Sequence, residues 1–369
     1  MGKFYDELFA TGGYLCALWR EAQRCMKFDA DIWIESVAAW FPSRKQTVAN
    51  AVSEGILSHA DALLTGVVAV PVADNIAAPE MAIRAADSAL DRADRKAAEV
   101  DLLIHSWLYY QGHDLWSPPH YIANQLGATN CLPIAIHQGC DGGALALQIA
   151  ALRLSAVEQE QTALVTSADR FAAPGIDRWN CQPSLALGDC GTAIVMSTSA
   201  DRPSPFRLEA IGTRTTVAFE VMNRGSAPFN DYPLASGLPA DFREVTDEAI
   251  EMLGQDFVFT TARSQVRTLL FETLAEAGVT DIAKELDVIA LPRVGTNTLE
   301  AIYLPEFETL RVRKLRFDST SGHLGCSDWA ADLNALYEGE IVEPGKYAVL
   351  IGAGGGFTWM CAVVKAFEE

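Results

Sequence analysis

Cys140 stands where a strand-like run ends and a helical pattern begins, in the stretch PIAIHQGCDGGALALQ at residues 133–148. The unpaired N–H groups and the dipole at a helix N-terminus favour negative charge, so a thiol placed there ionises more readily. Gly142 and Gly143 carry no side chains, which would let a substrate approach the backbone beside the sulfur. These residues predict a thiolate nucleophile, and the alternative is a small cysteine packed in the core.

A second stretch, GHLGCSDWAADLNAL, places a histidine in a glycine-flanked loop just ahead of a helical pattern. The helix is expected to open at Ser327 or Asp328, where a carboxylate stays ionised. His323, five residues before Asp328, could then act as the base for a thiol while the carboxylate orients it. A helix cap beside a solvent-exposed histidine is the alternative interpretation.

The third candidate is the glycine-rich stretch GAGGGFTW at residues 352–359. Consecutive glycines between two apolar strands can present bare N–H groups to a pocket, as an oxyanion hole for acyl transfer requires. A phosphate-binding loop fits poorly, because neither a Lys-Ser/Thr pair nor a helix follows. A tight hairpin turn without a chemical role is the alternative.

Composition narrows the classes of function. The chain has 369 residues, half of them apolar, and a formal net charge of −20 from 28 basic and 48 acidic residues. Such a charge argues against affinity for nucleic acid or anionic membranes. No apolar run is long enough for a membrane span, and the N-terminal residues do not resemble a secretion signal. Eight cysteines without a CxxC pair predict neither a disulfide framework nor a metal site, and favour a reduced, cytoplasmic setting.

Strand-like and helix-like segments alternate from residue 31 onward, which predicts an α/β protein with helices packed against buried sheets. Strands are expected at 31–42, 100–108, 131–139, 162–169, 187–199, 286–295 and in a closing hairpin at 345–366, and helices at 80–94, 119–127, 142–157, 245–278, 296–304 and 328–338. The run at 131–139 is expected to be a second buried strand. The helix-poor text at 200–240 could cover an entrance.

Each half of the chain contains strand, loop and helix, and ends in a glycine-bearing turn followed by an apolar strand: GDCGTAIVM in the first half and GAGGGFTWMCAVV in the second. This predicts an internal duplication with a boundary near residue 200. We expect halves at 31–200 and 201–369, after an N-terminal extension at 1–30 of unknown role that contains one or two amphipathic helical turns.

The motifs HQGCDGG, LGDCGTAIVM, LPRVG, the Gly-His loop and GAGGGFTW, in this order, resemble the thiolase superfamily and, within it, β-ketoacyl-carrier-protein synthase III. The resemblance covers roughly residues 31–369. It implies a thiolase-like five-layered αβαβα fold of two similar halves that works as a homodimer. It also implies acyl-enzyme chemistry on Cys140, with the amides of Cys140 and Gly355 as oxyanion donors. An acyl-CoA or acyl-carrier-protein donor is implied, with no permanently bound cofactor.

Two departures from that family alter the expected reaction. The family's histidine after the proline of the LP loop is replaced by Arg293, and His323 falls where the family has an asparagine. Arginine stays protonated and is no general base, so decarboxylative condensation by the usual route is not expected. A subgroup that resembles this chain carries a Gly-His-x-x-x-x-Asp stretch, matched here by His323 and Asp328. Its members occur in antibiotic pathways, where some load starter units and others transfer an acyl group to a sugar hydroxyl.

The sequence therefore predicts a synthase III-like acyltransferase of specialised, antibiotic-type metabolism. Cys140 would take the acyl group, His323 would activate the thiol and then a hydroxyl, amine or carrier acceptor, and Asp328 would orient His323. One alternative is a starter-unit β-ketoacyl synthase that has reassigned its base. Another is a non-catalytic partner subunit of a heterodimer.

Several further residues allow more than one role. Arg293 could hold the thiolate, bind a carboxylate on the acyl group, or form a structural ion pair. His137 is a rival base, although its strand position favours a histidine packed in the core. A basic cluster could meet the phosphate of a pantetheine arm or an acidic carrier protein, or could simply protect a sheet edge; it comprises Arg311, Arg313, Lys314 and Arg316. Aromatic residues that could line an acyl pocket flank one loop of the first half: Trp107, Tyr109, Tyr110 and Trp116.

Overall fold

The computed structural model describes residues 24–199, 201–232 and 237–368. Ten strands follow one another across one sheet in the order β11-β10-β12-β13-β9-β2-β8-β7-β5-β6, and β1 (Arg24–Met26) pairs with β9 beside this path. The strands of the first half are β2 (Ile32–Trp40), β5 (Leu102–Ser106), β6 (Leu132–Ile136), β7 (Thr162–Asp169) and β8 (Cys190–Ser197). Those of the second half are β9 (Phe206–Thr215), β10 (Leu286–Ala290), β11 (Arg313–Leu315), β12 (Tyr347–Gly354) and β13 (Thr358–Ala366).

The two groups of five strands repeat one another. Outward from the centre, β2-β8-β7-β5-β6 corresponds in order to β9-β13-β12-β10-β11. The directions correspond as well: the first three strands of each group pair antiparallel, and the last three pair parallel. The groups meet where Ile32–Ile34 of β2 pairs with Phe206–Leu208 of β9. This repetition is the pattern that an internal duplication would produce, and the boundary near residue 200 stays a prediction.

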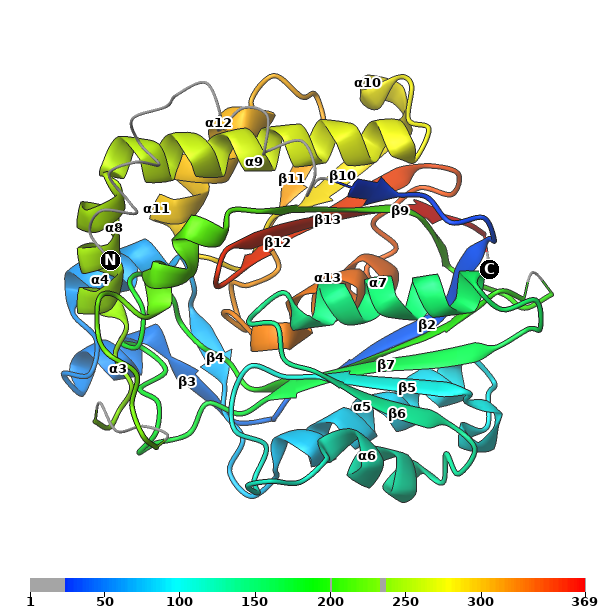
Figure 1. Ribbon diagram of the computed structural model, residues 1–369, viewed down its shortest axis with the longest axis horizontal. Coiled ribbons are helices and arrows are strands. Elements are labelled where there is room, and N and C mark those ends of the chain that lie inside the picture. Colours follow the sequence, from blue (N-terminus) through cyan, green and yellow to red (C-terminus); the bar gives the residue numbers. More distant parts are fainter. Residues whose placement is uncertain (1–23, 200, 233–236, 369) are drawn as a thin grey trace.

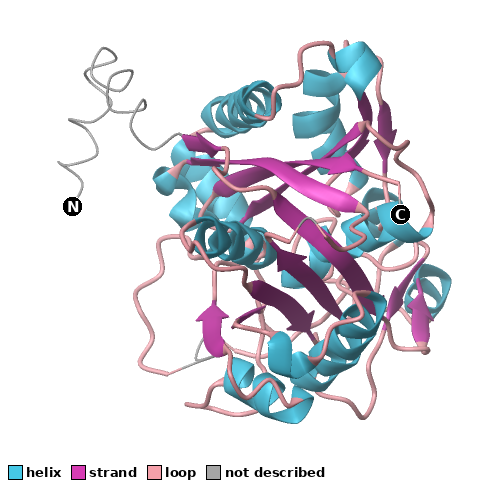
Figure 2. Cartoon of the chain, turned by 90° about the vertical axis from the view of Figure 1, so that its right-hand side faces the viewer, coloured by secondary structure: helices cyan, strands magenta, loops and turns pink. Residues whose placement is uncertain are grey.

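Helices and strands alternate in five layers (Figure 1). The long α9 (Gln255–Glu276) covers the outer face of the second group of strands, and α5 (Ala78–Arg92) with α6 (Pro118–Leu126) covers that of the first. Between the groups lie α7 (Gly142–Ser155) and α13 (Asp328–Glu338). The view turned by 90° shows helices both outside the strands and between them (Figure 2). This is the five-layered αβαβα arrangement that the sequence predicts.

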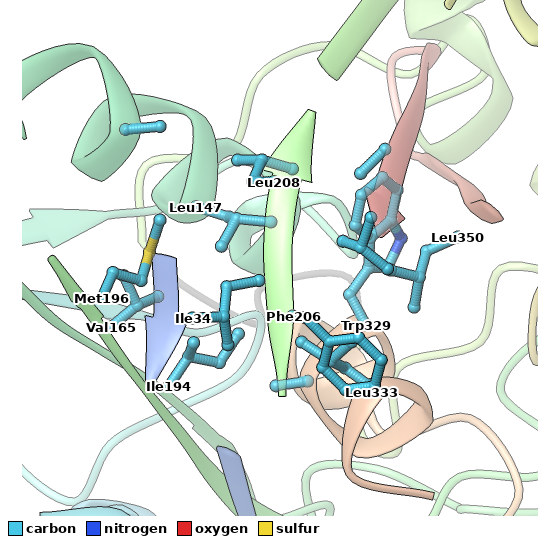
Figure 3. Close-up of a cluster of buried hydrophobic side chains, with 14 of the residues drawn as sticks. Ile34, Leu147, Val165, Ile194, Met196, Phe206, Leu208, Trp329, Leu333 and Leu350 are labelled. Atoms are coloured by element: carbon cyan, nitrogen blue, oxygen red, sulfur yellow. The ribbon is translucent and has the colours of Figure 1, made fainter. Parts of the chain in front are cut away.

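The central layer is held by an apolar core that both groups of strands share (Figure 3). Leu147 of α7 and Leu333 of α13 meet Ile34 of β2, Leu208 of β9 and Leu350 of β12 in this cluster. Because α7 and α13 lie between two layers of strands, side chains on most sides of each helix are buried, unlike those of a one-sided surface helix. This burial fixes the N-terminal ends of both helices, which carry the candidate site.

Local sequence explains where several helices begin and end. At the start of α5, the Glu80 carboxylate accepts a hydrogen bond from the N–H of Ala77 (2.6 Å). The helical pattern predicted at 245–278 divides at Gly254 into α8 (Arg243–Leu253) and α9. The shorter elements are β3 (Lys45–Thr47), α3 (Val48–Ser53), α4 (His59–Thr65), β4 (Ala69–Pro71), η1 (Ala97–Glu99), η2 (Val217–Asn223), α10 (Ile282–Glu285), α11 (Thr296–Thr298), the π-helix η3 (Leu299–Tyr303), α12 (Leu304–Phe307) and η4 (Gly325–Ser327).

One expectation from the sequence is wrong, and one strand was not expected. The run at 131–139 does not form a buried strand, because β6 is the edge of the sheet and Leu132 is 53% exposed. The helix-poor stretch at 200–240, where no strand was expected, includes β9, a ten-residue strand at the centre of the sheet. Most of the proposed N-terminal extension lies outside the described residues.

Candidate active site

Cys140 lies in the turn that joins β6 to α7, as the sequence predicts. The helix begins at Gly142 with Asp141 as its N-cap residue, so the sulfur sits at the positive end of the helix dipole. Gly139, immediately before the cysteine, has φ 56°, a left-handed conformation that glycine adopts at little cost. Cys140 remains partly exposed. The turn therefore presents the thiol at the end of the central helical layer.

His323 and Asp328 meet this thiol across the fold. The Nε2 atom of His323 lies 3.1 Å from the Sγ of Cys140, and its Nδ1 lies 2.6 Å from Oδ2 of Asp328. The other oxygen of Asp328 accepts the N–H of Leu324 at 2.7 Å. Asp328 is the first residue of α13, which follows the cap at Ser327. The structure thus brings the three residues predicted from the sequence into one thiol–imidazole–carboxylate chain.

The loop that carries His323 is anchored to the first half of the chain. The N–H of His323 donates to the carbonyl of Ala186 at 2.8 Å, and the carbonyl of His323 accepts the N–H of Gly188 at 2.9 Å. Burial favours the neutral imidazole, yet the Asp328 carboxylate and the Cys140 sulfur together raise the pKa of His323 well above its ordinary value. The structure therefore places an imidazole whose protonated form is favoured against the Cys140 sulfur.

The glycine hairpin packs directly on the cysteine turn. A Cβ at Gly139 would lie 3.2 Å from the backbone N of Gly355, and one at Gly354 would lie 2.8 Å from the backbone N of Asp141. Only bare backbone fits at this contact. The predicted oxyanion residue Gly355 thus lies beside the Cys140 turn, although its role as a donor stays a prediction.

Gly142 and Gly143 do not open the backbone to a substrate, as the sequence suggests; they make room for another segment of the chain. A Cβ at Gly143 would lie 2.1 Å from the carbonyl oxygen of Cys326, and one at Gly142 would lie 2.7 Å from the Cys326 sulfur. The space beside these glycines is therefore filled by the η4 turn and is not open to a substrate. Because η4 directly precedes α13, the absent side chains allow α7 and α13 to begin close together.

Sequence reasoning missed Asp169, a fully buried carboxylate at the end of β7. One of its oxygens accepts the N–H groups of Leu108 and Tyr109, and the other accepts that of Cys326. Burial raises the pKa of Asp169 to about 7, while these N–H groups act in the opposite direction. Its only signal in the sequence is a charged residue that ends an otherwise uncharged strand. Asp169 joins the loop after β5 to the turn that leads into α13.

Sequence reasoning also missed Asp141, the residue that directly follows Cys140. Burial raises the pKa of its carboxyl well above the ordinary value, against the hydrogen bond from the N–H of Gly354. Its Oδ2 atom is buried without a hydrogen-bond partner. In the sequence, Asp141 is an ordinary polar residue at the start of a helix, and such residues are usually exposed.

Arg293 does not face a substrate. Its side chain is 2% exposed and forms an ion pair with Asp332 of α13 at 2.7 Å. Of the three roles considered from the sequence, this contact matches the ion pair and leaves no open fork for a carboxylate on the acyl group. His137 is not packed in the core as expected: it is exposed, and its Nε2 contacts the carbonyl of Leu108 at 3.2 Å.

The basic cluster lies at and beside the edge strand β11. Arg313 pairs with Asp287 at 2.7 Å, Arg316 pairs with Asp318 at 2.6 Å, and the Nζ of Lys314 donates to a backbone carbonyl. Arg311 is exposed. Most of the cluster is therefore engaged within the chain, and contact with a carrier or pantetheine stays a prediction.

The loop after β5 borders a cavity of about 350 Å³. Tyr109 and Tyr110 lie in its wall, together with Arg170 and residues 172–175. Trp107 and Trp116 are not among its lining residues; Trp107 instead stacks on His105. Within the described ranges, the His, Cys, Asp and Glu side chains form no group of three or more suited to hold a metal ion. None of the helices described there is long and apolar enough to cross a membrane.

Comparison with known proteins defines the class of the fold and then the family. The solved structure of the ChlB3 acyltransferase matches with a TM-score of 0.84 and 30% identity, over 91% of this chain and 98% of that one. The 3-oxoacyl-[acyl-carrier-protein] synthase III of Aquifex aeolicus matches with a TM-score of 0.72 and 20% identity, over 90% of this chain and 99% of that one. The β-ketoacyl-[acyl-carrier-protein] synthase III of Clostridium perfringens is 26% identical over 297 residues, which span 78% of this chain and 84% of the relative. No family model matches the sequence.

These matches define a protein with the thiolase fold. The chain belongs to the synthase III-like proteins of the thiolase superfamily, and it is an enzyme of the transferase or condensing class.

Proposed function

We propose that this chain is a cysteine-dependent acyltransferase that moves an acyl group from a coenzyme A or carrier-protein thioester to a hydroxyl, amine or carrier acceptor. The observation that carries the proposal is the chain of contacts from the Cys140 sulfur through His323 to Asp328. The resemblance to a subgroup with the same Gly-His-x-x-x-x-Asp stretch supports a place in specialised, antibiotic-type metabolism. The similarity to an acyltransferase, ChlB3, supports the same type of reaction.

The reaction consists of two acyl transfers. The Cys140 thiolate attacks the thioester carbonyl, the bond to the donor sulfur breaks, and the departing thiolate takes the proton held on His323. The neutral imidazole then accepts a proton from the acceptor hydroxyl or amine as that group attacks the acyl-enzyme. The Cys140 thiolate leaves, which restores the ion pair with His323. Amides of Cys140 and Gly355 would stabilise the oxyanion in both steps, with no bound cofactor required.

The alternative, a starter-unit condensation, is less well supported. Condensing members of the family use a histidine and an asparagine to bind the malonyl thioester carbonyl. In this chain Arg293 stands at the histidine position and is held by Asp332, while His323 stands at the asparagine position and contacts Cys140 and Asp328. Neither residue is free to bind that carbonyl. The second alternative, a non-catalytic partner subunit, fits poorly with a complete thiol–imidazole–carboxylate chain.

Product analysis distinguishes transfer from condensation. We expect the purified protein, given benzoyl-CoA or acetyl-CoA with a hydroxyl or amine acceptor, to form an ester or amide. With ¹³C-labelled malonyl-CoA added, we expect no labelled CO2 and no β-ketoacyl thioester by mass spectrometry, because no donor pair binds the malonyl carbonyl. A labelled β-ketoacyl product would instead favour the starter-unit synthase.

A homodimer is the second part of the proposal. Strand β6 (sequence LPIAI) ends the sheet with Leu132 and Ala135 exposed, whereas the opposite edge strand, β11 (sequence RKL), carries two cations. An apolar edge with open N–H and C=O groups favours pairing with another strand, and cations oppose it. The β6 edges of two copies would therefore pair with each other.

We expect Ala135→Lys to convert the dimer into a monomer, because two ammonium groups would be brought together where β6 meets its copy. Size-exclusion chromatography with light scattering measures the mass. Ala275→Lys, on the exposed side of α9, is the matched control and should leave the mass unchanged. A dimeric Ala135→Lys protein would contradict pairing through this edge.

A further inference from the structure

Helix α13 carries two carboxylates one helical turn apart, the partly exposed Asp328 and the buried Asp332. The Asp328 side chain is 14% exposed and that of Asp332 is 6% exposed. Like charges at this spacing repel each other, and burial increases the cost of both. Each carboxylate nevertheless has a cation of its own, since His323 faces Asp328 and Arg293 faces Asp332. Because each carboxylate has its own cation, Asp328 and Asp332 do not compete for a single one.

Arg293 holds Asp332 and the histidine loop at the same time. Its Nε and Nη2 atoms both contact Oδ1 of Asp332, at 2.8 and 2.7 Å. Its Nη1 donates to the hydroxyl of Ser321 at 2.5 Å and to the carbonyl of Gly322 at 3.4 Å. Ser321 and Gly322 directly precede His323. The guanidinium thus ties the loop that carries the base to the helix that carries its carboxylate.

The titratable groups that face Arg293 come from three segments. Besides Asp332 and Asp328 on α13, it faces Asp318 after β11 and the Cys190 thiol of β8. Asp318 has a cation of its own in Arg316, at 2.6 Å. Burial raises the pKa of Asp332 to about 7, and Arg293 acts against this rise. Arg293 is therefore the cation that compensates Asp332, while it lies 3.9 Å from Asp328.

We propose that Arg293 is a positioning residue: by pairing with Asp332 and hydrogen-bonding Ser321, it reserves Asp328 for His323 and holds the imidazole against the Cys140 sulfur. This inference rests on the proposed cysteine chemistry. It gives the arginine at the family's histidine position a role without contact to substrate. Asp332, which the sequence did not suggest, then contributes by holding the guanidinium of Arg293 in place.

The test uses the pH dependence of iodoacetamide alkylation at Cys140, followed by mass spectrometry of the full-length protein. In Arg293→Met, we expect the His323 loop to move away from the sulfur, so alkylation near pH 6 falls about tenfold while alkylation near pH 9.5 is retained. Arg293→Lys should recover part of the loss, because an ammonium can still reach Asp332 but cannot also hold Ser321.

A matched control separates positioning from general stability. Arg95 and Glu35 form another buried, two-contact ion pair, at 2.9 and 2.6 Å, with side chains 7% and 1% exposed. Arg95→Met should lower the melting temperature as Arg293→Met does and leave the alkylation profile unchanged. If Arg293→Met fails to fold, the double variant Arg293→Met/Asp332→Leu replaces the pair with apolar groups of similar size, which proteins commonly tolerate. Its profile should shift in the same direction but by less, because the contact to Ser321 is lost while Asp332 no longer competes for His323.

A wild-type profile in a folded Arg293→Met or double variant would overturn the positioning role. Because alkylation needs no acyl substrate, that result is distinguishable from failure of the proposed function. The proposed function fails if wild-type Cys140 is alkylated readily at pH 6 and yet accepts no acyl group from any thioester.

Discussion

Replacing Cys140 with alanine is expected to abolish the covalent acyl adduct completely. The wild-type protein should gain one acyl group when it is mixed with a suitable acyl thioester, because the sulfur lies at a helix N-terminus and 3.1 Å from the imidazole of His323. Without the sulfur there is no atom to carry the acyl group. Intact-protein mass spectrometry reads the adduct directly. Acetyl-, benzoyl- and succinyl-CoA span short, aromatic and dicarboxylic donors.

Other thiols require a control, since seven free cysteines lie in the described part of the chain. Cys131 is half-buried, and its sulfur contacts the carbonyl of Ala128 rather than any base. Cys131→Ala should therefore keep the full adduct. An adduct of unchanged size in Cys140→Ala would contradict the mechanism and direct attention to another nucleophile.

The same donors separate two roles of Arg293. A preference for the dicarboxylic acyl group that disappears in Arg293→Met would indicate a substrate-binding fork. The buried pair with Asp332 argues against it, because the guanidinium contacts Asp332, Ser321 and Gly322 instead. We expect no such preference.

The three residues of the chemical chain could be found from the sequence because each has a local signature. A cysteine between a strand and a helix, a histidine in a glycine-flanked loop and an aspartate at a helix start are patterns of a few residues. Their meeting could not be found locally, since 183 positions separate Cys140 from His323. The order of motifs that resembles a known family supplied this missing long-range information.

Residues whose role depends on tertiary packing have no local signature in the sequence. Asp332 reads as an ordinary polar position of a helix, yet it is 4% exposed because α13 lies between two layers of strands. Gly143 reads as an opening for substrate, yet the backbone of Cys326 fills that space. Neither feature could be found locally, because sequence patterns describe one element at a time, whereas these contacts join separate elements of the fold.

The strand β6 gives a third example. Its apolar text is typical of a buried parallel strand, and it does pair in parallel with β5. The order of strands leaves it at the edge, which no local pattern reveals. An apolar strand at an exposed edge favours a partner, and this is why the dimer is placed there.

Replacing Asp328 with asparagine is expected to reduce acyl-enzyme formation by a factor on the order of 10²–10⁴. The asparagine oxygen can still accept the N–H of Leu324, so its NH2 group would point at Nδ1 of His323. Nδ1 must then accept a hydrogen bond, which leaves the proton of the neutral ring on Nε2, facing the sulfur. Such a ring cannot take the proton of a thiol. His323→Gln removes the base altogether and should cost at least as much.

The pH dependence of Cys140 alkylation should shift in one direction when the Asp328 carboxylate is lost. Asp328 is a principal cause of the raised pKa of His323, against the effect of burial. Without that carboxylate, burial dominates and the pKa of His323 falls, so the imidazolium that stabilises the thiolate is lost near neutral pH. The acid limb of Cys140 alkylation should therefore move to higher pH in Asp328→Asn. His137→Gln is the control: because its ring contacts the carbonyl of Leu108, it should leave the limb in place. An unmoved limb in Asp328→Asn would mean that His323 does not set the ionisation of Cys140.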